Sequence, residues 1–333
     1  MPSVTPHARL TRDSAPVTAL EFCPGADSGS GPWLATASDG MVRLWDASRR
    51  SVRLEYEHSP SDEVLGLDFS ADGAVLATLG DDRLARLWDT WSGRCLRTLE
   101  CPDDDDLHVR NGDGAVALSD DGALLATSHA LDFAVHVWDT STGDLVRTLE
   151  NRDLAEDAGQ AIGLAFVPRR PSVLAVLLEE QGVRLWDMAA GGVVRSFGLP
   201  GRGIADAMRF SPDGTLLAAG GNHVVVWDAR SGRVVAGGDT DDCGGTSAAA
   251  ISPDGRLLAT SGYSHGEGHL WDLPALVRCG AFPGTGDLLP HSALVTRLDG
   301  AGGDIGFSPD GRFIAGTSHD TTVVWRVTSP AAH

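Results

Sequence analysis

Short apolar runs alternate with turn-forming sequences along almost the whole chain. Runs such as VLATL and LLATS are rich in Val, Leu and Thr, and clusters of Gly, Asp and Ser bound them. This pattern is typical of β-strands, whereas the three-to-four-residue apolar spacing of amphipathic helices is absent. The sequence therefore predicts an all-β protein built from many short strands.

A dipeptide recurs at a nearly constant interval and divides the chain into seven units. Successive marker tryptophans are 43, 50, 48, 41, 44 and 54 residues apart. A fixed period of this length indicates a repeat architecture, in which each unit is one supersecondary element. The markers are Trp45-Asp46, Trp88-Asp89, Trp138-Asp139, Trp186-Asp187, Trp227-Asp228, Trp271-Asp272 and a variant, Trp325-Arg326.

A second marker, Ser-x-Asp-Gly, keeps step with the first. It begins at Ser70, Ser119, Ser211, Ser252 and Ser308, and an apolar run follows each copy. Asp bonds its own backbone in such turns, and Gly supplies a left-handed residue. Each unit therefore reads as strand, tight turn, strand, turn, strand ending in Trp-Asp, turn, strand.

These markers resemble the WD-repeat family over essentially the whole chain. The resemblance implies one domain over 1–333, a seven-bladed β-propeller with four antiparallel strands per blade. The seventh unit stops after its third strand, so the N-terminal strand is expected to close the last blade and remove an open sheet edge. The expected blades are 16–57, 63–100, 113–150, 160–198, 205–238, 247–282, and 304–327 completed by 7–12.

The resemblance also assigns structural roles. The seven tryptophans are expected to fill the wedge between neighbouring sheets. In the family a His, a Ser or Thr, the Trp and a turn Asp often form a hydrogen-bonded network. Here the turn Asp is expected at Asp39, Asp82 and Asp320, the hydroxyl at Ser38 and Ser318, and the histidine at His58 or His291. Blade two has Gly80 at the position expected for the hydroxyl.

Charge narrows the classes of partner. The chain of 333 residues has 26 Lys and Arg against 46 Asp and Glu, a net charge of −20. This charge disfavours nucleic acid and anionic membranes as partners. The five cysteines lack C-x-x-C spacing, and no signal peptide or membrane-spanning run is apparent, so we expect a cytoplasmic protein with reduced thiols. The abundance of Ala, Gly, Arg, Asp and Val indicates a high-GC, actinobacterial-like bacterial source.

The resemblance places partner binding on the loops that join one blade to the next. We take these as 57–63, 101–113, 151–160, 199–206, 238–246 and 283–304, which hold 18 acidic residues against four arginines. Three interpretations remain open: a merely solvated rim, a docking face for a basic protein segment, and a cation site, although the alternating ligands of a calcium loop are absent. The candidate partner-binding residues are Asp103, Asp104, Asp105, Asp106, Asp153, Glu156, Asp157, Asp239, Asp241 and Asp242.

Two further features have both structural and functional interpretations. Trp91, in the turn after Trp88-Asp89, is a candidate contact residue on the opposite face, near Trp33; either ring could instead cover a neighbouring strand. His265 and His269 have the spacing of a helical zinc pair, but they lie in a Gly-rich turn, which favours exposed turn histidines.

The sequence contains no nucleophile elbow, phosphate-binding Gly loop or H-E-x-x-H string. We therefore expect a non-catalytic protein-interaction scaffold, a monomer on its own, that needs no cofactor or metal and docks partners on its acidic loop rim. The alternative is an enzyme, or a propeller that binds a small ligand or cation, with its site at the central channel.

Overall fold

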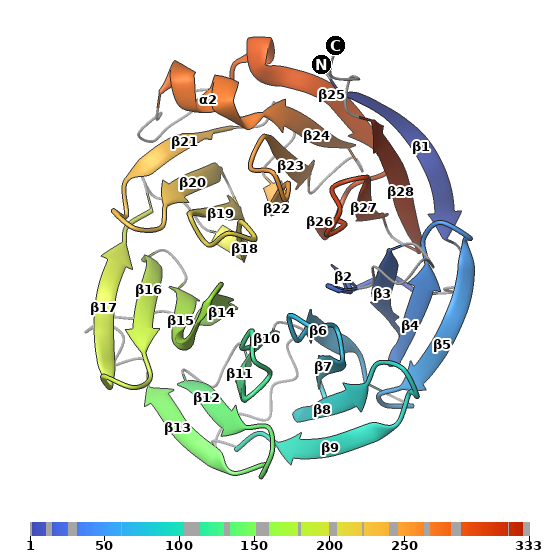
Figure 1. Ribbon diagram of the computed structural model, residues 1–333, viewed down its shortest axis with the longest axis vertical. Coiled ribbons are helices and arrows are strands. Elements are labelled where there is room, and N and C mark those ends of the chain that lie inside the picture. The colour runs from blue at the N-terminus through green and yellow to red at the C-terminus, as the bar shows by residue number, and fades with distance from the viewer. Residues whose placement is uncertain are drawn as a thin grey trace.

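The computed structural model describes the chain except for residues 1, 11–14, 26–31, 61, 103–113, 130–133, 151–159, 179–180, 200–204, 222, 240–245, 263–266, 281–287, 319 and 329–333. The described strands form seven four-stranded antiparallel sheets. Figure 1 shows these sheets arranged as blades around a central axis, with the first strand of each unit innermost. The predicted seven-bladed propeller is confirmed.

The first three blades follow the chain without interruption. Blade one comprises β2 (Ala19–Phe22), β3 (Trp33–Ser38), β4 (Met41–Asp46) and β5 (Ser51–Glu57). Blade two comprises β6 (Val64–Phe69), β7 (Val75–Gly80), β8 (Leu84–Asp89) and β9 (Cys95–Glu100). Blade three comprises β10 (Gly114–Leu118), β11 (Leu124–His129), β12 (Ala134–Asp139) and β13 (Leu145–Glu150).

Blades four to six continue the pattern. Blade four comprises β14 (Ala161–Val167), β15 (Arg170–Leu178), β16 (Gly182–Asp187) and β17 (Gly192–Phe197). Blade five comprises β18 (Ala205–Phe210), β19 (Leu216–Gly221), β20 (Val224–Asp228) and β21 (Val234–Gly238). Blade six comprises β22 (Thr246–Ile251), β23 (Leu257–Gly262), β24 (Glu267–Asp272) and β25 (Leu294–Asp299).

Blade seven joins the two ends of the chain. It comprises β26 (Ile305–Phe307), β27 (Phe313–Ser318), β28 (Thr321–Thr328) and β1 (Ser3–Leu10), and β1 pairs with β28 from Ser3 opposite Thr328 to Leu10 opposite Thr322. The expected closure is confirmed, although the closing strand begins earlier than the predicted 7–12. Because β1 occupies the outer edge of β28, the last blade has as many strands as the others.

Blade six differs from the predicted segmentation. A short helix, α2 (Leu273–Cys279), and a 3-10 turn, η1 (His291–Ala293), separate β24 from β25. The fourth strand therefore lies beyond the predicted end at 282, inside the predicted rim loop 283–304. Asp272 caps α2 by accepting a hydrogen bond from the Ala275 amide, and Leu273 and Leu276 are its buried residues. Seven residues are two turns, and two buried positions three residues apart are too few for a recognisable helical period.

The Ser-x-Asp-Gly turns share one hydrogen-bonding scheme. In blade two the Ser70 hydroxyl donates to Asp72 (2.7 Å) and accepts from the Val75 amide (3.0 Å), while Gly73 has φ of 69°. The same Ser–Asp bond recurs in the turns that begin at Ser119, Ser211, Ser252 and Ser308. These turns fix the link between the inner strand and the next strand of each blade.

The apolar core lies between neighbouring blades. Each marker tryptophan is buried, and clusters combine residues of adjacent sheets, such as Trp33 of blade one with Leu76 of blade two. A side chain in the middle of a sheet therefore contacts the next sheet, whereas the innermost and outermost strands border the axis and the perimeter (Figure 1).

Every outer strand has a register shift opposite the marker tryptophan. In blade three, Val137 pairs with Arg147 and Trp138 pairs with Leu145, so Val146 is an extra residue. The corresponding residues of the other blades are Arg53, Leu96, Val194, Val235, Val295 and His7. Such a β-bulge twists an exposed edge and interrupts its ladder of backbone groups.

Candidate functional site

The inner strands place a small set of charged side chains near the ring axis. In each inner strand one residue, such as Phe22 in blade one, pairs with the residue of the second strand that itself pairs with the marker tryptophan. The residue directly before it is therefore equivalent in all seven blades. Four blades have Ala or Gly there. The others have Glu21, Asp68 and Arg209, which together with Asp304 we call the axial cluster.

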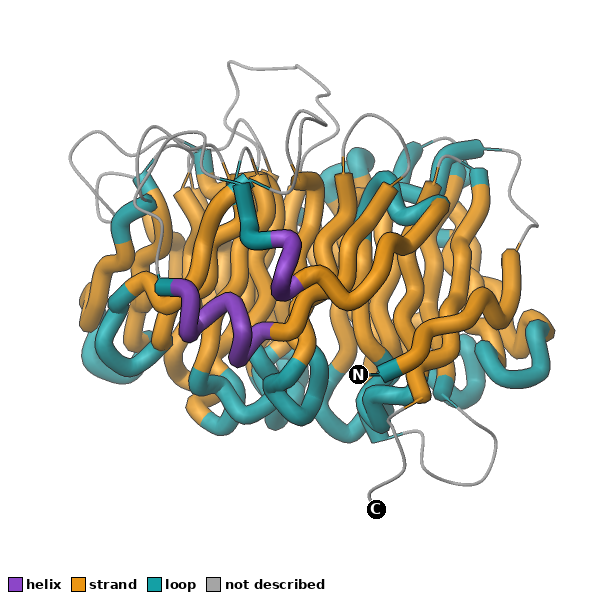
Figure 2. The backbone as a smooth tube through the Cα atoms, turned by 90° about the horizontal axis from the view of Figure 1, so that it is seen from above, coloured by secondary structure: helices purple, strands orange, loops and turns teal. Residues whose placement is uncertain are grey.

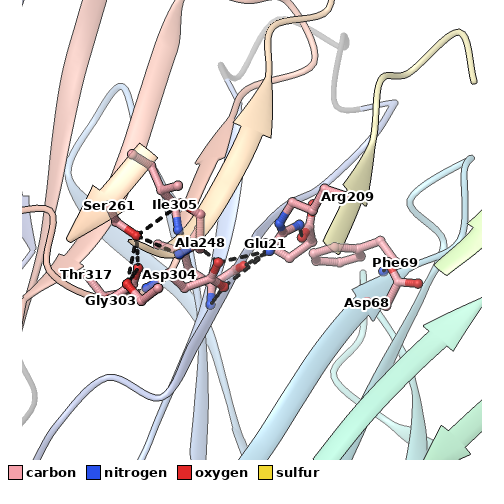
Figure 3. A network of polar contacts seen from close by, with 12 residues as sticks. Glu21, Asp68, Phe69, Arg209, Ala248, Ser261, Gly303, Asp304, Ile305 and Thr317 are labelled. Atoms are coloured by element: carbon pink, nitrogen blue, oxygen red, sulfur yellow. Dashed lines mark hydrogen bonds and ion pairs between the residues drawn. The ribbon is translucent and has the colours of Figure 1, made fainter. Parts of the chain in front are cut away.

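Arg209 joins three blades that are far apart in sequence. Its guanidinium, from β18 of blade five, donates to the Glu21 carboxylate of blade one. It also donates to both carboxylate oxygens of Asp304 in blade seven, and each of these two bonds is 3.2 Å long. It also donates to the Leu20 carbonyl at 3.2 Å. Figure 3 shows the guanidinium directed toward Glu21 and Asp304. The side chain therefore acts as a brace between blades one, five and seven.

Asp304 forms hydrogen bonds with groups of both blade one and blade seven. Its carboxylate accepts the amides of Leu20 (3.0 Å) and Ile305 (2.8 Å), and its own amide donates to the Thr317 hydroxyl at 2.8 Å. The Leu20 bond crosses from blade one to blade seven, beside the chain closure. Asp304 therefore supports the contact between the first and the last blade.

Asp68 makes a corresponding link between blades two and three. Its carboxylate accepts the Phe69 amide (2.9 Å) and the Leu118 amide of the neighbouring inner strand (2.7 Å). Enclosure by protein raises the pKa of Asp68 to about 7, and the charge of Glu21 adds to the rise. Asp68 therefore changes charge near neutral pH.

The charges of the axial cluster are mutually dependent. Enclosure raises the pKa of Glu21, although Arg209 opposes this rise. Enclosure alone lowers the pKa of Arg209, but Glu21 and Asp304 outweigh it and raise that pKa above its ordinary value. The Arg209 guanidinium thus directs its bonds to two carboxylates, Glu21 and Asp304, and to one carbonyl, while Asp68 bonds to backbone amides. This arrangement stabilises the ring and leaves little donor capacity for a ligand.

No alternative site emerges from the described part of the chain. Within these residues no group of three or more His, Cys, Asp or Glu side chains could hold a metal ion, and no helix is long and apolar enough to cross a membrane. His269 is buried against the Trp271 ring in β24, and its predicted zinc partner, His265, lies outside the described residues. Cys23, Cys95 and Cys279 are free thiols, and the Cys101 thiol contacts the Thr127 hydroxyl at 3.6 Å.

The hydrogen-bonded network of the family is present in blade two, but its hydroxyl is not where the sequence placed it. His58 contacts the Thr78 hydroxyl (2.7 Å) and Asp82 (3.2 Å), and the Trp88 indole donates to the same hydroxyl (3.0 Å). The expected position, Gly80, is wrong by two residues, because alternate residues of a strand share a face. Burial alone raises the pKa of Asp82, but bonds from His58 and Arg86 outweigh it and lower this pKa to about 2.

Other blades retain only parts of this network. The marker indole also donates to a threonine in blades one, three and six. The Trp227 indole donates to the Gly198 carbonyl instead, and the buried Trp186 indole nitrogen has no hydrogen-bond partner. Asp39 and Asp320 are exposed, Ser38 donates to the Ala15 carbonyl, and His291 is exposed in η1, so none of these repeats the blade-two arrangement.

Most of the predicted rim residues fall outside the described part of the chain. These are Asp103, Asp104, Asp105, Asp106, Asp153, Glu156, Asp157, Asp241 and Asp242. Asp239, at the end of blade five, is described: its carboxylate contacts the His223 ring, and its carbonyl accepts the Leu289 amide at 2.7 Å. The segment after α2 is thereby fixed to the end of β21.

Trp91 lies against Trp33 in the turn between β8 and β9. The two rings meet edge to face at 4.6 Å between centroids, and the Arg53 guanidinium lies 4.0 Å from the centroid of Trp33. Trp33 is buried, whereas Trp91 is 44% exposed. One part of the Trp91 ring therefore packs on blade one and another part faces solvent, and its role as a partner contact stays a prediction.

Comparison with known proteins agrees with the repeat geometry. The sequence pattern described as "WD domain, G-beta repeat" matches residues 5–46, 50–89, 93–139, 199–228 and 277–325, more than half of the chain. The chain belongs to the WD-repeat family. All four strands of blade four, in which the Trp186 indole lacks an acceptor, and β22, β23 and β24 of blade six lie outside the matched segments.

Several characterised WD-repeat proteins are similar to this chain. Periodic tryptophan protein 2 homolog of Mus musculus is 28% identical over 58% of this chain and 24% of its own length. The guanine nucleotide-binding protein subunit beta of Arabidopsis thaliana is 33% identical over 37% and 32%. COMPASS component SWD3 of Saccharomyces cerevisiae is 27% identical over 58% and 56%. The matches thus span from a quarter to just over half of these eukaryotic relatives.

The axial cluster is the feature that sequence reasoning missed. Its signal is a charged residue directly before the aromatic residue that precedes the turn, as in LEF, LDF and MRF. Aligning the seven units at this position separates these charges from the Ala and Gly of the other blades.

Proposed function

We propose that this WD-repeat propeller is a non-catalytic scaffold that docks a protein partner with a basic segment on the acidic loops between its blades. The observation that carries the proposal is the uneven charge. Outside the strands and the axial cluster, the predicted inter-blade segments hold 14 acidic residues and three arginines, so more than half of the net charge of −20 belongs to them. Loops at the ends of a rigid scaffold are the usual location of binding residues.

Electrostatic steering gives this arrangement a physical function. Clustered carboxylates attract a cationic segment over a Debye length of about 8 Å at physiological salt and raise its association rate. The same charge repels nucleic acid and anionic lipid. We therefore propose a protein partner, and a propeller that is monomeric until the partner binds.

The names of two relatives support a scaffold function. One is named as a subunit and another as a component, so each is described as part of a larger assembly. By extension we propose that this chain also works within an assembly. Its bacterial source and cytoplasmic location remain predictions from composition.

Two charge reversals of equal size test the docking face. Asp104→Lys changes the connection between β9 and β10, whereas Asp144→Lys makes the same change in the exposed β12–β13 turn, at the other end of the strands. Immobilised wild-type and variant proteins are exposed to lysate of the native host at low salt, and retained proteins are eluted with rising salt. We expect one stoichiometric protein, lost with Asp104→Lys and with reversal of Asp103–Asp106, but retained by Asp144→Lys.

Equal retention by both variants contradicts rim docking while leaving a scaffold role at another surface. Failure to retain any protein favours the second candidate, a small-ligand or catalytic function near the axis. The excess of carboxylates over guanidinium in the axial cluster is the observation behind that candidate. Calorimetric titration with small cationic ligands, comparing wild type with Glu21→Gln, examines it directly.

A further inference from the structure

The outer strands of three consecutive blades leave their bulge residues uncovered. Leu96 in β9, Val146 in β13 and Val194 in β17 are 42%, 55% and 48% exposed, and the bulge puts each at the same place in its blade. Leu145 and Val193, directly before two of them, are also exposed. The exposed apolar residues thus recur at one register in three consecutive outer strands, which makes them a repeated feature of this part of the perimeter.

In blade five the bulge position of the outer strand is covered by a helix. Its bulge residue, Val235, is 9% exposed because α2 packs over β21, with Leu273 and Leu276 in the same apolar cluster. Figure 1 shows α2 on the perimeter beside β21, while no described helix lies beside β9, β13 or β17. The chain thus contains its own example of a short helix, with leucines three residues apart, seated on an outer strand.

In each of these three strands the bulge residue is followed directly by an arginine: Arg97, Arg147 and Arg195. Arg97 donates to the carbonyls of Thr140 (3.0 Å), Ser141 and Thr142 (3.0 Å) in the turn of the next blade, and Arg195 donates to the Ser231 carbonyl at 3.3 Å. Among the described residues no carboxylate lies within ion-pair distance of these three guanidinium groups, in a protein of net charge −20. The outer strands of blades two to four therefore place exposed apolar residues directly beside arginines that no described carboxylate pairs, with Glu100, Asp144 and Glu150 further along the same segments.

We propose that this surface, the outer wall, binds a short amphipathic helix of a partner protein, with leucines three or four residues apart and acidic residues flanking them. The outer wall consists of Leu96, Leu145, Val146, Val193 and Val194 with Arg97, Arg147 and Arg195. The proposal rests on the scaffold function, but it uses a surface separate from the acidic loops. Leucines cover the bulge residues as Leu273 and Leu276 of α2 cover Val235, and carboxylates neutralise the arginines.

The geometry favours a helix over an added β-strand. The bulge interrupts the backbone ladder at the exposed apolar pair, and a strand that pairs along the edge needs a regular ladder there. A helix has no unpaired backbone groups along its length and contacts the wall with side chains alone.

The test uses a defined peptide rather than an unidentified partner. The probe is a fluorescein-labelled, crosslinked helix of about 18 residues, with leucines along one face and glutamates on both flanks. Fluorescence anisotropy measures its affinity for the full chain, for Val146→Asp and for Arg147→Glu. The matched control is Val277→Asp, because Val277 is also an exposed valine (40%) but lies on α2.

We expect binding to weaken about tenfold with Val146→Asp and to remain unchanged with Val277→Asp. Arg147→Glu, and a peptide with lysines in place of the glutamates, are expected to weaken binding by removing the charge complement. The propeller with reversed Asp103–Asp106 is expected to bind the peptide as wild type does, so failure of rim docking and failure of the outer wall are distinguishable.

Three results would overturn the proposal. One is no binding, or equal affinity for wild type and Val146→Asp. Another is equal affinity for an uncrosslinked peptide with a central proline, which would indicate an extended occupant. The third is self-association of the propeller in analytical ultracentrifugation that Val146→Asp abolishes, because the occupant of the wall would then be a second copy of the chain.

Discussion

The innermost and outermost strands of the ring handle exposed positions in opposite ways. The inner strands carry charged side chains, and contacts between blades satisfy them, as Arg209 does with Glu21 and Asp304. The outer strands carry exposed apolar residues, of which Val146 is the most exposed. In a propeller the core lies between sheets, and each of these strands contributes only some of its side chains to it, such as Phe69 of β6 and Leu149 of β13. The distance of a strand from the ring axis therefore does not by itself predict the polarity of its exposed side chains. Their polarity depends on which neighbouring groups they contact.

The largest expected effect is at the axis. Arg209→Leu leaves Glu21 and Asp304 facing each other without a cation, and we expect the free energy of unfolding to fall by about 2–4 kcal/mol, the lower part of the range for a fully buried pair. Arg195→Leu removes an equal charge from the outer strand and is expected to change it by less than about 0.5 kcal/mol. Urea unfolding of both variants measures the difference. Equal losses of unfolding free energy in the two variants would mean that Arg209 does not stabilise the contacts between blades one, five and seven.

The next largest effect on stability is expected in the polar network of blade two, which lies between the axis and the perimeter. Thr78→Val leaves His58 Nδ1 and the Trp88 indole nitrogen buried without their hydroxyl partner, and we expect a loss of about 2–3 kcal/mol. The converse change, Val176→Thr in blade four, offers an acceptor to the unpaired Trp186 indole and is expected to stabilise by up to about 1 kcal/mol. Thermal melting compares the pair, and a neutral Thr78→Val would contradict the role of the network.

A pH effect distinguishes the axis from the wall. The pKa of Asp68 is about 7 in the folded protein and about 3.9 in the unfolded chain. The folded state therefore holds more protons between these values, and its stability falls as pH rises through this window. We expect the stability of wild type relative to Asp68→Asn to decrease by about 1–2 kcal/mol from pH 5 to pH 7 and to level off above pH 8. Parallel denaturation curves across this range would exclude the shift.

The smallest effect is expected at Trp91. Trp91→Ala removes one edge-to-face contact with Trp33, and we expect a loss of about 1 kcal/mol or less. If Trp91 also contacts a partner, the same variant weakens partner retention far more than it weakens folding. A large fall in melting temperature with unchanged retention would show that the ring only covers blade one.

The repeat was readable because its markers perform local tasks. A Ser-x-Asp-Gly turn bonds within itself, so Ser70 and Asp72 predict a turn wherever the chain places them. The seven units then predicted the blades, and the missing strand of the seventh predicted the closure by β1. What local patterns predicted poorly were the bounds of blade six, where α2 is too short to show a period.

The axial cluster was hidden for a different reason. Arg209 and Glu21 are 188 residues apart, and each is an ordinary charged residue in its own strand. The hydroxyl error in blade two is similar, because Gly80 and Thr78 lie on the same face of β7 and only the position of Trp88 decides between them. Side-chain pairing across blades depends on register and on the ring, which no single unit contains.

The closure of the ring has a consequence for synthesis. β1 pairs with β28, which is synthesised much later, since the Ser3 and Thr328 hydroxyls bond across 325 residues. At about 5–20 residues per second, β1 waits roughly 16–65 s for its partner. Blade seven is therefore the one blade that cannot form from consecutive strands, and its sheet is completed only after the other six have been synthesised.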